Sequence, residues 1–392
     1  MAGRLGELAR AFTWLGLTAF GGPAAHIAIM QREFVDRRGW LTHQRFADLI
    51  GLSSLLPGPT STELALGIGY ERARWRGLLI AGLGFIVPAS LIVLTIAVAY
   101  EQLGELAWAR SLLYGMAPVV IAVIAHAVVM LAPTAFSDAT AWLVGIGAFG
   151  ASVAGFFLEL EVLQPLVVLV AGALVMLAVR RLPRLALDAA GGSLMLPMGD
   201  VPLALVAAAG GVALGLGAIF LTFLKMGVVV FGSGYVLVAF LGSELVTPGY
   251  ITETELLDAI AIGQLTPGPV FTTATFIGYQ LAGIPGAVVA TVGIVLPSFV
   301  LVAMTHPWLQ RIRASATLSA GIDGLNAAAI GLIAASIMFL GRDAFLPDGA
   351  VDPLAVGLGL GALIILVSGR LGPLPLLLAG GLIGFAAQVA AR

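Results

Sequence analysis

Residues 55–62 read Leu-Leu-Pro-Gly-Pro-Thr-Ser-Thr, and residues 265–272 read Leu-Thr-Pro-Gly-Pro-Val-Phe-Thr. Each Pro-Gly-Pro lies inside an apolar segment, 45–70 in the first case and 256–280 in the second. Proline removes a backbone donor and glycine adopts conformations that end a helix, so both segments are expected to break there. The limbs on either side are too short to cross a bilayer, which needs about 20 apolar residues. The two stretches therefore predict re-entrant hairpins or discontinuous helices.

Two further apolar segments are interrupted in a related way. The segment 8–35 contains Phe-Gly-Gly-Pro at 20–23, and the segment 219–242 contains Phe-Gly-Ser-Gly at 231–234. Each limb is about 10–14 residues long, which is again too short to span. The chain is therefore expected to carry four broken hairpins, two in each half.

The breaks and their flanking residues recur in the same order in both halves, which indicates an internal duplication. The matched residues are Gly16, Phe20, Gly21 and Glu33 with Gly227, Phe231, Gly232 and Glu244; Pro57, Gly58 and Pro59 with Pro267, Gly268 and Pro269; and Gly69, Tyr70, Gly84 and Pro88 with Gly278, Tyr279, Gly293 and Pro297. Chance matches between Leu- and Ala-rich segments would not keep these motifs in register. We therefore divide the chain into an N-terminal repeat, 1–185, a linker with an extra transmembrane helix, 186–218, and a C-terminal repeat, 219–392.

The composition is that of a membrane protein. Hydrophobic residues make up 60% and charged residues 10% of the chain, against about 45–50% and about 25% in soluble domains. The mean hydropathy is +1.06. These values exclude a soluble enzyme and a disordered chain, and a net charge of −2 offers no basic surface for nucleic acid. With no Cys and four scattered His, we expect no metal centre and no cofactor.

Uninterrupted apolar runs predict about nine full spans beside the four broken hairpins. The expected fold is therefore an all-α polytopic membrane protein made of two inverted-topology repeats with discontinuous or re-entrant helices. The expected spans are 78–100, 111–133, 140–157, 163–180, 201–218, 286–305, 318–341, 353–369 and 373–390.

The loop charges indicate that the two repeats have opposite orientations. Loops rich in Arg and Lys face the cytoplasm, and the sign of the loop charge swaps between equivalent loops of the two halves. The loops expected in the cytoplasm are 32–45, 71–76 and 180–184, and those expected outside are 101–110, 158–162, 244–256 and 280–285. An odd number of spans between the copies would turn the second one over. Paired broken helices in inverted repeats are typical of secondary transporters.

The breaks also predict an anion site. A helix that begins at a break presents backbone N–H groups and a partial positive charge, and glycine lets a ligand approach the backbone. Hydroxyl side chains gather at the same places. The alternative is that these Gly, Ser and Thr residues only let helices pack closely. The expected substrate-binding residues are Gly21, Gly22, Pro23, His26, Gly58, Thr60, Ser61, Thr62, Lys225, Gly232, Ser233, Gly268, Thr272 and Thr273.

Two ionisable residues near the breaks are functional candidates, because charge inside a membrane is costly. Lys225 precedes the second-half Phe-Gly break and has no acidic neighbour between Phe220 and Phe231, so we expect it to attract the anion. The alternative is that it snorkels to the interface. Glu63 follows the first Pro-Gly-Pro and is the candidate for proton coupling, unless it lies at the cytoplasmic mouth.

These motifs together resemble the chromate ion transporter (CHR) family, in its long two-domain form. The stretches that carry the resemblance are 20–26, 33–42, 55–62 and 69–70 in the first half, and 223–227, 231–232, 266–269 and 278–279 in the second. The resemblance implies two oppositely oriented domains, and export of chromate driven by protons or by the membrane potential, giving chromate resistance. Sulfate and other oxyanions have nearly the same shape and charge, so they remain open as substrates.

The expected function is therefore secondary transport of an oxyanion, which the resemblance implies is chromate, across the inner (cytoplasmic) membrane. A channel of the same fold is the nearest alternative. An intramembrane enzyme acting on lipid phosphate is a distant one, since the chain has neither H-E-x-x-H nor G-x-S-x-G. The expected partners are the oxyanion and the lipid bilayer, without nucleic acid, and a homodimer is possible.

Overall fold

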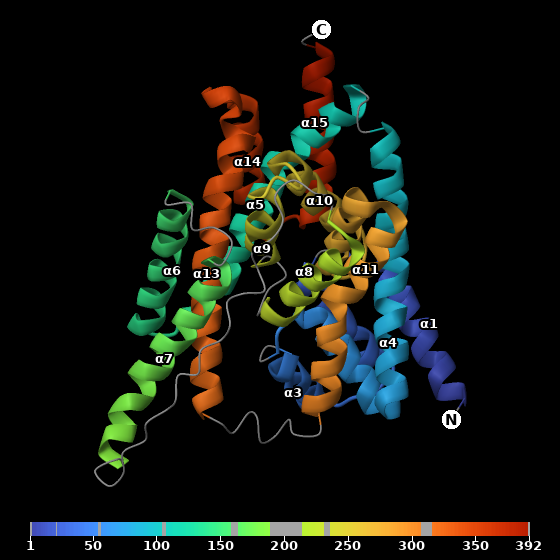
Figure 1. The fold of residues 1–392 in the computed structure, drawn as a ribbon. Helices are drawn as coiled ribbons and strands as arrows, with labels where there is room; N and C mark the ends of the chain where they lie inside the picture. The colour runs from blue at the N-terminus through green and yellow to red at the C-terminus, as the bar shows by residue number, and fades with distance from the viewer. Residues whose placement is uncertain are drawn as a thin grey trace.

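A computed structural model describes residues 2–20, 22–53, 56–103, 107–157, 164–188, 214–230, 236–306 and 316–390. Every regular element in these ranges is a helix (Figure 1). Five helices are long and apolar enough to cross a membrane by length and composition. The expected all-α, multi-pass membrane fold is confirmed.

The two halves contain the same sequence of elements. The first half holds α1 (Ala2–Thr18), α2 (Gly22–Gln31), the π-helix η1 (Arg32–Arg37), α3 (His43–Ser53), α4 (Thr60–Leu103), α5 (Ala107–Ala135), α6 (Ala139–Phe157) and α7 (Gln164–Asp188). The second half holds α8 (Leu216–Val229), α9 (Val236–Leu241), the π-helix η3 (Gly242–Val246), α10 (Glu253–Leu265), the 3-10 turn η4 (Val270–Thr272), α11 (Thr273–Thr305), α13 (Ala316–Phe345), the 3-10 turn η6 (Pro347–Gly349), α14 (Pro353–Val367) and α15 (Pro373–Ala390).

Each expected span except one coincides with a helix or a helix limb. The exception, 201–218, lies mostly outside the described residues, as does most of the linker 186–218. The apolar parts of α6, α7 and α14 are shorter than those of the five long helices.

α4 and α11 are hairpins rather than single straight helices. In α4 the chain leaves helical geometry at Ala73 (φ −153°) and Arg74 (φ 54°), and in α11 it does so at Ala282 (φ −155°) and Gly283 (φ 60°). These positions are equivalent in the two repeats, and so are their dihedral angles. In each hairpin the chain folds back, so that the two limbs touch.

Glycines make that close approach possible. A Cβ placed on Gly69 would lie 2.4 Å from the carbonyl oxygen of Gly77, and one on Gly278 would lie 2.4 Å from that of Gly286. Small residues at helix crossings allow the backbones to meet in this way. The Gly-Tyr motifs found in both halves of the sequence therefore mark helix crossings.

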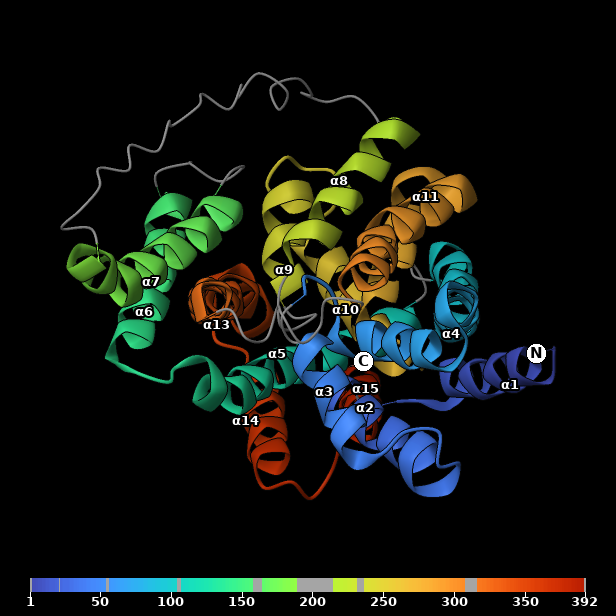
Figure 2. The same cartoon turned by 90° about the horizontal axis from the view of Figure 1, so that it is seen from below.

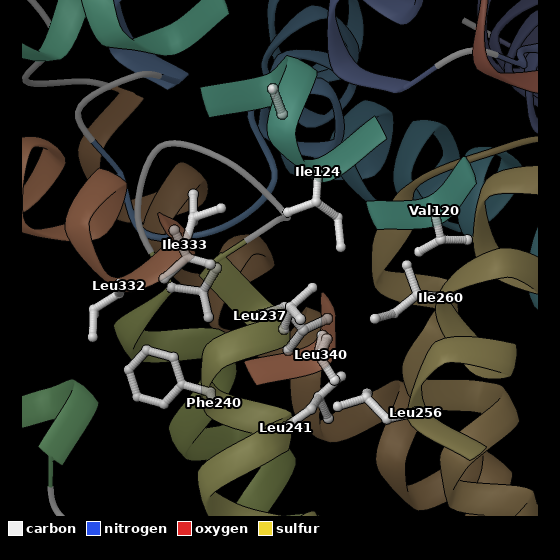
Figure 3. Close-up of a cluster of buried hydrophobic side chains, with 14 of the residues drawn as sticks. Val120, Ile124, Leu237, Phe240, Leu241, Leu256, Ile260, Leu332, Ile333 and Leu340 are labelled. Carbon is white, nitrogen blue, oxygen red and sulfur yellow. The ribbon is translucent and has the colours of Figure 1, made fainter. Parts of the chain in front are cut away.

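The main hydrophobic core lies around the short helices of the second half. Figure 3 shows side chains of α5, α9, α10 and α13 converging on one another. From below, α6 and α7 pack on one side of α13, while α8, α11, α4 and α1 lie on the far side of α9 and α10 (Figure 2). The short helices α9 and α10 thus lie between these two groups of helices. The labelled core residues are Val120, Ile124, Leu237, Phe240, Leu241, Leu256, Ile260, Leu332, Ile333 and Leu340.

One pair of equivalent helices, α3 and α10, lies toward opposite ends of the molecule. α3 is near the lower end in Figure 1, whereas its counterpart α10 is near the upper end. α4 and α11 also make reciprocal contacts, in which a tyrosine beside the kink of one helix touches the end of the other. Tyr70, beside the α4 kink, stacks on His306 at the end of α11 (ring centroids 4.3 Å apart), and Tyr279, beside the α11 kink, donates to Glu101 at the end of α4 (2.5 Å). Reciprocal contacts of this kind are expected around a two-fold axis.

The glycine crossing gives a test of the hairpin. Gly69→Ala places a methyl group against the Gly77 backbone, and overpacking of this kind costs about 1–3 kcal/mol. We expect a lower midpoint of thermal unfolding for the protein purified in detergent. Gly147→Ala in α6 is the matched control, because nothing lies within 4 Å of its Cβ position. Equal midpoints for the two variants would contradict the crossing.

Candidate anion-binding site

Three of the four expected helix breaks are seen in the described residues: no helix runs through 57–59 or 267–269, and α1 ends at Thr18 before α2 begins at Gly22. The fourth, 231–234, lies outside the described residues. The helices that end and begin at the breaks are α1 and α2, α3 and α4, α8 and α9, and α10 and η4. Each Pro-Gly-Pro directly precedes a helical turn, as the sequence predicts.

The breaks of the two repeats bind one another. Gly58 N–H in the first repeat donates to the carbonyl of Val230 in the second (2.7 Å), and Gly268 N–H in the second donates to the carbonyl of Ala19 in the first (2.8 Å). Ala19 and Val230 are equivalent residues, each just before a Phe-Gly pair. Each Pro-Gly-Pro is therefore joined to the Phe-Gly break of the other repeat.

These bonds change the expected role of the two glycines. Their N–H groups are engaged by carbonyls, so Gly58 and Gly268 do not offer free donors to an anion, contrary to expectation. Their conformations nevertheless require glycine, with φ of +134° and +97°. The close approach predicted for these positions is made by the protein itself.

Each central glycine packs on the long helix of the other repeat. A Cβ on Gly58 would lie 2.4 Å from Ser298 Oγ and 2.6 Å from Glu63 Oε1. A Cβ on Gly268 would lie 2.4 Å from the Cβ of Ala89. Ser298 and Ala89 are equivalent residues, so the same contact occurs twice, with a hydroxyl in only one copy.

The hydroxyls expected at the site differ in what they bind. Thr272 donates to the carbonyl of Pro269 (2.9 Å). Thr62 and Thr273 have buried hydroxyls without a hydrogen-bond partner among the described residues. Ser61 is also buried, and Thr60 is half-buried. Buried hydroxyls that lack a partner are available to a ligand or to water.

Two buried polar residues of this region were missed by the sequence analysis. Ser298 Oγ and Gln264 Nε2 are buried and have no partner among the described residues. Gln264 is the penultimate residue of α10 and directly precedes the Leu-Thr-Pro-Gly-Pro stretch, and Ser298 follows Pro297. The repeat alignment could have identified Ser298, since its match, Ala89, follows the equivalent Pro88.

Glu63 is the most deeply buried carboxylate near the breaks. Its side chain lies in the first turn of α4, the residue is 1% exposed, and neither carboxylate oxygen has a partner among the described residues. It does not lie at an exposed mouth, which was the alternative from sequence. The equivalent residue in the second repeat is Thr273, so the carboxylate is present in one copy only.

His26 binds the backbone of the first break. Its Nε2 is 3.0 Å from the carbonyl oxygen of Ala19, which also accepts the Gly268 N–H. Its ring meets the Phe85 ring edge-on, and its Nδ1 is buried without a partner among the described residues. Gly22 begins α2 with φ +78°, followed by Pro23. The expected site residues Gly21, Gly232 and Ser233 lie outside the described residues.

Lys225 is not unpaired, and that part of the expectation is wrong. Its Nζ lies 2.5 Å from Glu244 Oε1, and the two side chains are 32% and 12% exposed. Glu244 is not among the sequence neighbours of Lys225 along α8, because it lies on the π-helix η3, after the break. The ion pair, rather than a ligand, satisfies the ammonium in this structure.

In the first repeat, the carboxylate equivalent to Glu244 is paired with different cations. Glu33, on the π-helix η1, pairs with Arg38 (2.7 Å) and Arg37 (3.1 Å), and the position of Lys225 is taken by Trp14. Burial raises the pKa of Glu33, but the hydrogen bonds from the two arginines outweigh it and hold the pKa below its usual value. Each π-helix thus carries a carboxylate that is paired with a cation, buried in the first repeat and partly buried in the second.

A partly open pocket of about 520 Å³ lies between the ends of α4, α5, α10 and α13. In it Tyr100 donates to Asp258 on α10 (2.7 Å). Sequence analysis did not single out this cavity. Its polar lining includes Tyr100, Glu101, Arg110, Tyr114, Glu255 and Asp258. Among the described residues, no three His, Asp or Glu side chains gather as metal ligands.

Comparison with known proteins decides the family. The sequence profile described as "Chromate transporter" matches residues 6–177 and 217–385. The chain belongs to the chromate transporter family. The family resemblance drawn from the sequence motifs is therefore confirmed.

Curated relatives cover most of the chain. A chromate transport protein of Cupriavidus metallidurans is 33% identical over 86% of this chain and 83% of its own length. A probable chromate transport protein of Synechococcus elongatus is 32% identical over 86% and 85%. A chromate transport protein of Pseudomonas aeruginosa is 30% identical over 97% and 91%. No solved structure matches. Family membership supports the transporter class over the enzyme alternative.

The Lys225–Glu244 ion pair gives a second test. Glu244→Gln leaves the partly buried ammonium without its counter-charge, which costs roughly 1–3 kcal/mol. Lys225→Met combined with Glu244→Gln removes both charges and should recover most of that loss. We expect the single variant to unfold at a lower temperature than the double variant.

Glu7→Gln serves as the control, because Glu7 is 50% exposed in its pair with Arg72 and should contribute little. If the double variant were no more stable than Glu244→Gln, the two charges would not be coupled in the folded protein.

Proposed function

We propose that this chain exports chromate across the cytoplasmic membrane as a secondary transporter and so confers chromate resistance. Family membership and the names of its relatives support chromate as the substrate. The observation that carries the proposal is the joining of the breaks through Gly58 and Gly268. Backbone of this kind is tolerated at membrane depth only where it is enclosed by protein or lines a binding cavity.

The proposed site lies where the two repeats meet. Oxyanions are bound by N–H and O–H donors, and this region offers the buried hydroxyls of Thr62, Thr273 and Ser298 and the amide of Gln264. Lys225 contributes its charge only in a state in which Glu244 releases it.

We propose that the repeats are inverted in the membrane and that the Arg-rich end, with loops 32–45 and 71–76, faces the cytoplasm. The membrane potential, negative inside, then favours the exit of an anion, and a proton gradient is the alternative driving force. Each chain carries the breaks of both repeats, so a homodimer would hold two complete sites.

Flux measurements test the proposal. The purified protein is reconstituted into liposomes, and chromate movement is followed by absorbance under imposed voltage and pH gradients. We expect a pH gradient imposed at zero membrane potential to drive chromate against its own concentration gradient. A channel cannot do this, because flux through a channel follows only the electrochemical gradient of chromate itself. Sulfate is added as a competitor to measure selectivity. Equal competition by sulfate would assign the protein to a broader oxyanion class, and the absence of any chromate flux would refute the proposal.

Alanine at either central glycine should abolish this flux. In Gly58→Ala the methyl group meets Ser298 and Glu63, and in Gly268→Ala it meets Ala89, in conformations that alanine adopts poorly. We expect at least about a tenfold loss of flux for each variant, the equivalent of about 1.4 kcal/mol. Gly147→Ala, on the open face of α6, should transport normally. Unchanged flux in both break variants would exclude the breaks from the transport pathway.

Single cysteines test the inverted orientation, because the chain has none of its own. Arg76→Cys lies just after the α4 kink and Thr247→Cys lies just after η3, and both positions are exposed. An impermeant thiol reagent applied to intact cells should label Thr247→Cys and should label Arg76→Cys only after the membrane is opened. Labelling of both from the same side would rule out inversion.

A further inference from the structure

The carboxyl group of Glu63 is held in an unusual place for an ionisable side chain. It lies against the backbone of Gly58, at the break that binds the second repeat, and the residue is 1% exposed. Neither of its oxygens has a hydrogen-bond partner among the described residues. Across Gly58 lies the hydroxyl of Ser298, from α11, which is likewise buried and without a partner.

The charged groups around Glu63 bind other residues. On its own helix, Glu71 binds Arg45 of α3 and His306 of α11. Other partnered groups on helices that pack against α4 include Glu7 of α1 with Arg72, His26 of α2 with the Ala19 carbonyl, Asp48 of α3 with Gln44, and Asp258 of α10 with Tyr100. None of these pairs includes Glu63, so nothing in them compensates a negative charge there.

A buried carboxylate without a partner is costly, and such a group becomes neutral by binding a proton. A second negative charge brought to the same break would raise that cost further, because like charges repel strongly where little water screens them. A dianion and an ionised Glu63 therefore exclude each other, whereas a dianion and a protonated Glu63 do not.

We propose that Glu63 carries a proton together with the substrate, so that one proton and one oxyanion cross the membrane in the same direction. This inference rests on the proposed function and names the coupling ion of that site. No covalent bond forms or breaks: the proton binds a Glu63 oxygen from one side of the membrane and leaves to the other. Chromate as a dianion with one proton crosses with a net charge of −1, which the membrane potential drives outward.

Ser298 is the positioning residue for this proton. Its oxygen and that of Glu63 both lie within 2.6 Å of the point where a Cβ on Gly58 would stand, so the two groups face the same small space. The hydroxyl can accept the hydrogen bond of the protonated carboxyl. Removing it should weaken the protonated form and move the pH dependence to lower pH. The first repeat has alanine at the equivalent position, so Ser298→Ala should be tolerated by the fold.

The test measures chromate and protons together. Liposomes containing the purified protein are loaded with chromate, the potential is clamped at zero with potassium and valinomycin, and an external dye reports protons. The pH is kept in the alkaline range in which chromate is entirely the dianion. For the native protein we expect one proton to leave with each chromate. Glu63→Gln should move chromate without protons, while the exposed-site control Glu7→Gln should match the native protein.

Binding measurements test the inference even if a variant does not transport chromate. Over the pH range in which Glu63 of the substrate-free protein is ionised, equilibrium dialysis of the native protein in detergent should give a chromate affinity that rises about tenfold for each unit fall in pH, as linkage to one proton requires. Glu63→Gln should bind with an affinity independent of pH, and Ser298→Ala should keep the dependence at a lower pH.

Proton movement by Glu63→Gln equal to that of the native protein, or an unchanged pH slope of its binding, would overturn the inference. Chromate flux through the native protein without protons would overturn it too, and would leave the proposed function standing. If the native protein neither moved nor bound chromate, the proposed function itself would fail.

Discussion

A polypeptide that stops being helical inside a membrane leaves N–H and C=O groups that lipid cannot satisfy. In this protein the pairs Gly58–Val230 and Gly268–Ala19 meet that demand, each joining one repeat to the other. The glycines, the crossing hairpins and the packing of each Pro-Gly-Pro on the opposite long helix all follow from bringing these groups together. The interface between repeats is therefore built around hydrogen bonds that neither repeat can make alone.

Much of this arrangement could be predicted from the sequence because it depends on patterns of neighbouring residues. Apolar run lengths identified the helices, and Pro-Gly-Pro identified the breaks. Contacts between distant segments could not be predicted in the same way. The partner of Lys225, Glu244, lies beyond a break, and the hydroxyl of Ser298 reaches Gly58 only through the folding of the other repeat. The donors of Gly58 and Gly268 looked free because their acceptors lie far along the chain.

The two repeats share a backbone and differ in chemistry. Glu63 corresponds to Thr273, Ser298 to Ala89, and His26 to Leu237. These differences all lie at the central breaks, where the two halves touch. The carboxylates of the π-helices keep their role in both repeats, although the cation that pairs with them comes from a different element. A symmetric scaffold thus holds an asymmetric set of polar groups.

The crossed hydrogen bonds also bear on how the chain matures during synthesis. When the first half leaves the ribosome, the carbonyl of Ala19 has His26 beside it but not yet the amide of Gly268, and Gly58 has no acceptor at all. Until the C-terminal half is inserted, the N-terminal half therefore lies in the bilayer with backbone polar groups that lack their hydrogen-bond partners. Such an intermediate is a natural substrate for membrane quality control, and truncated chains are expected to be degraded rather than to persist as folded halves.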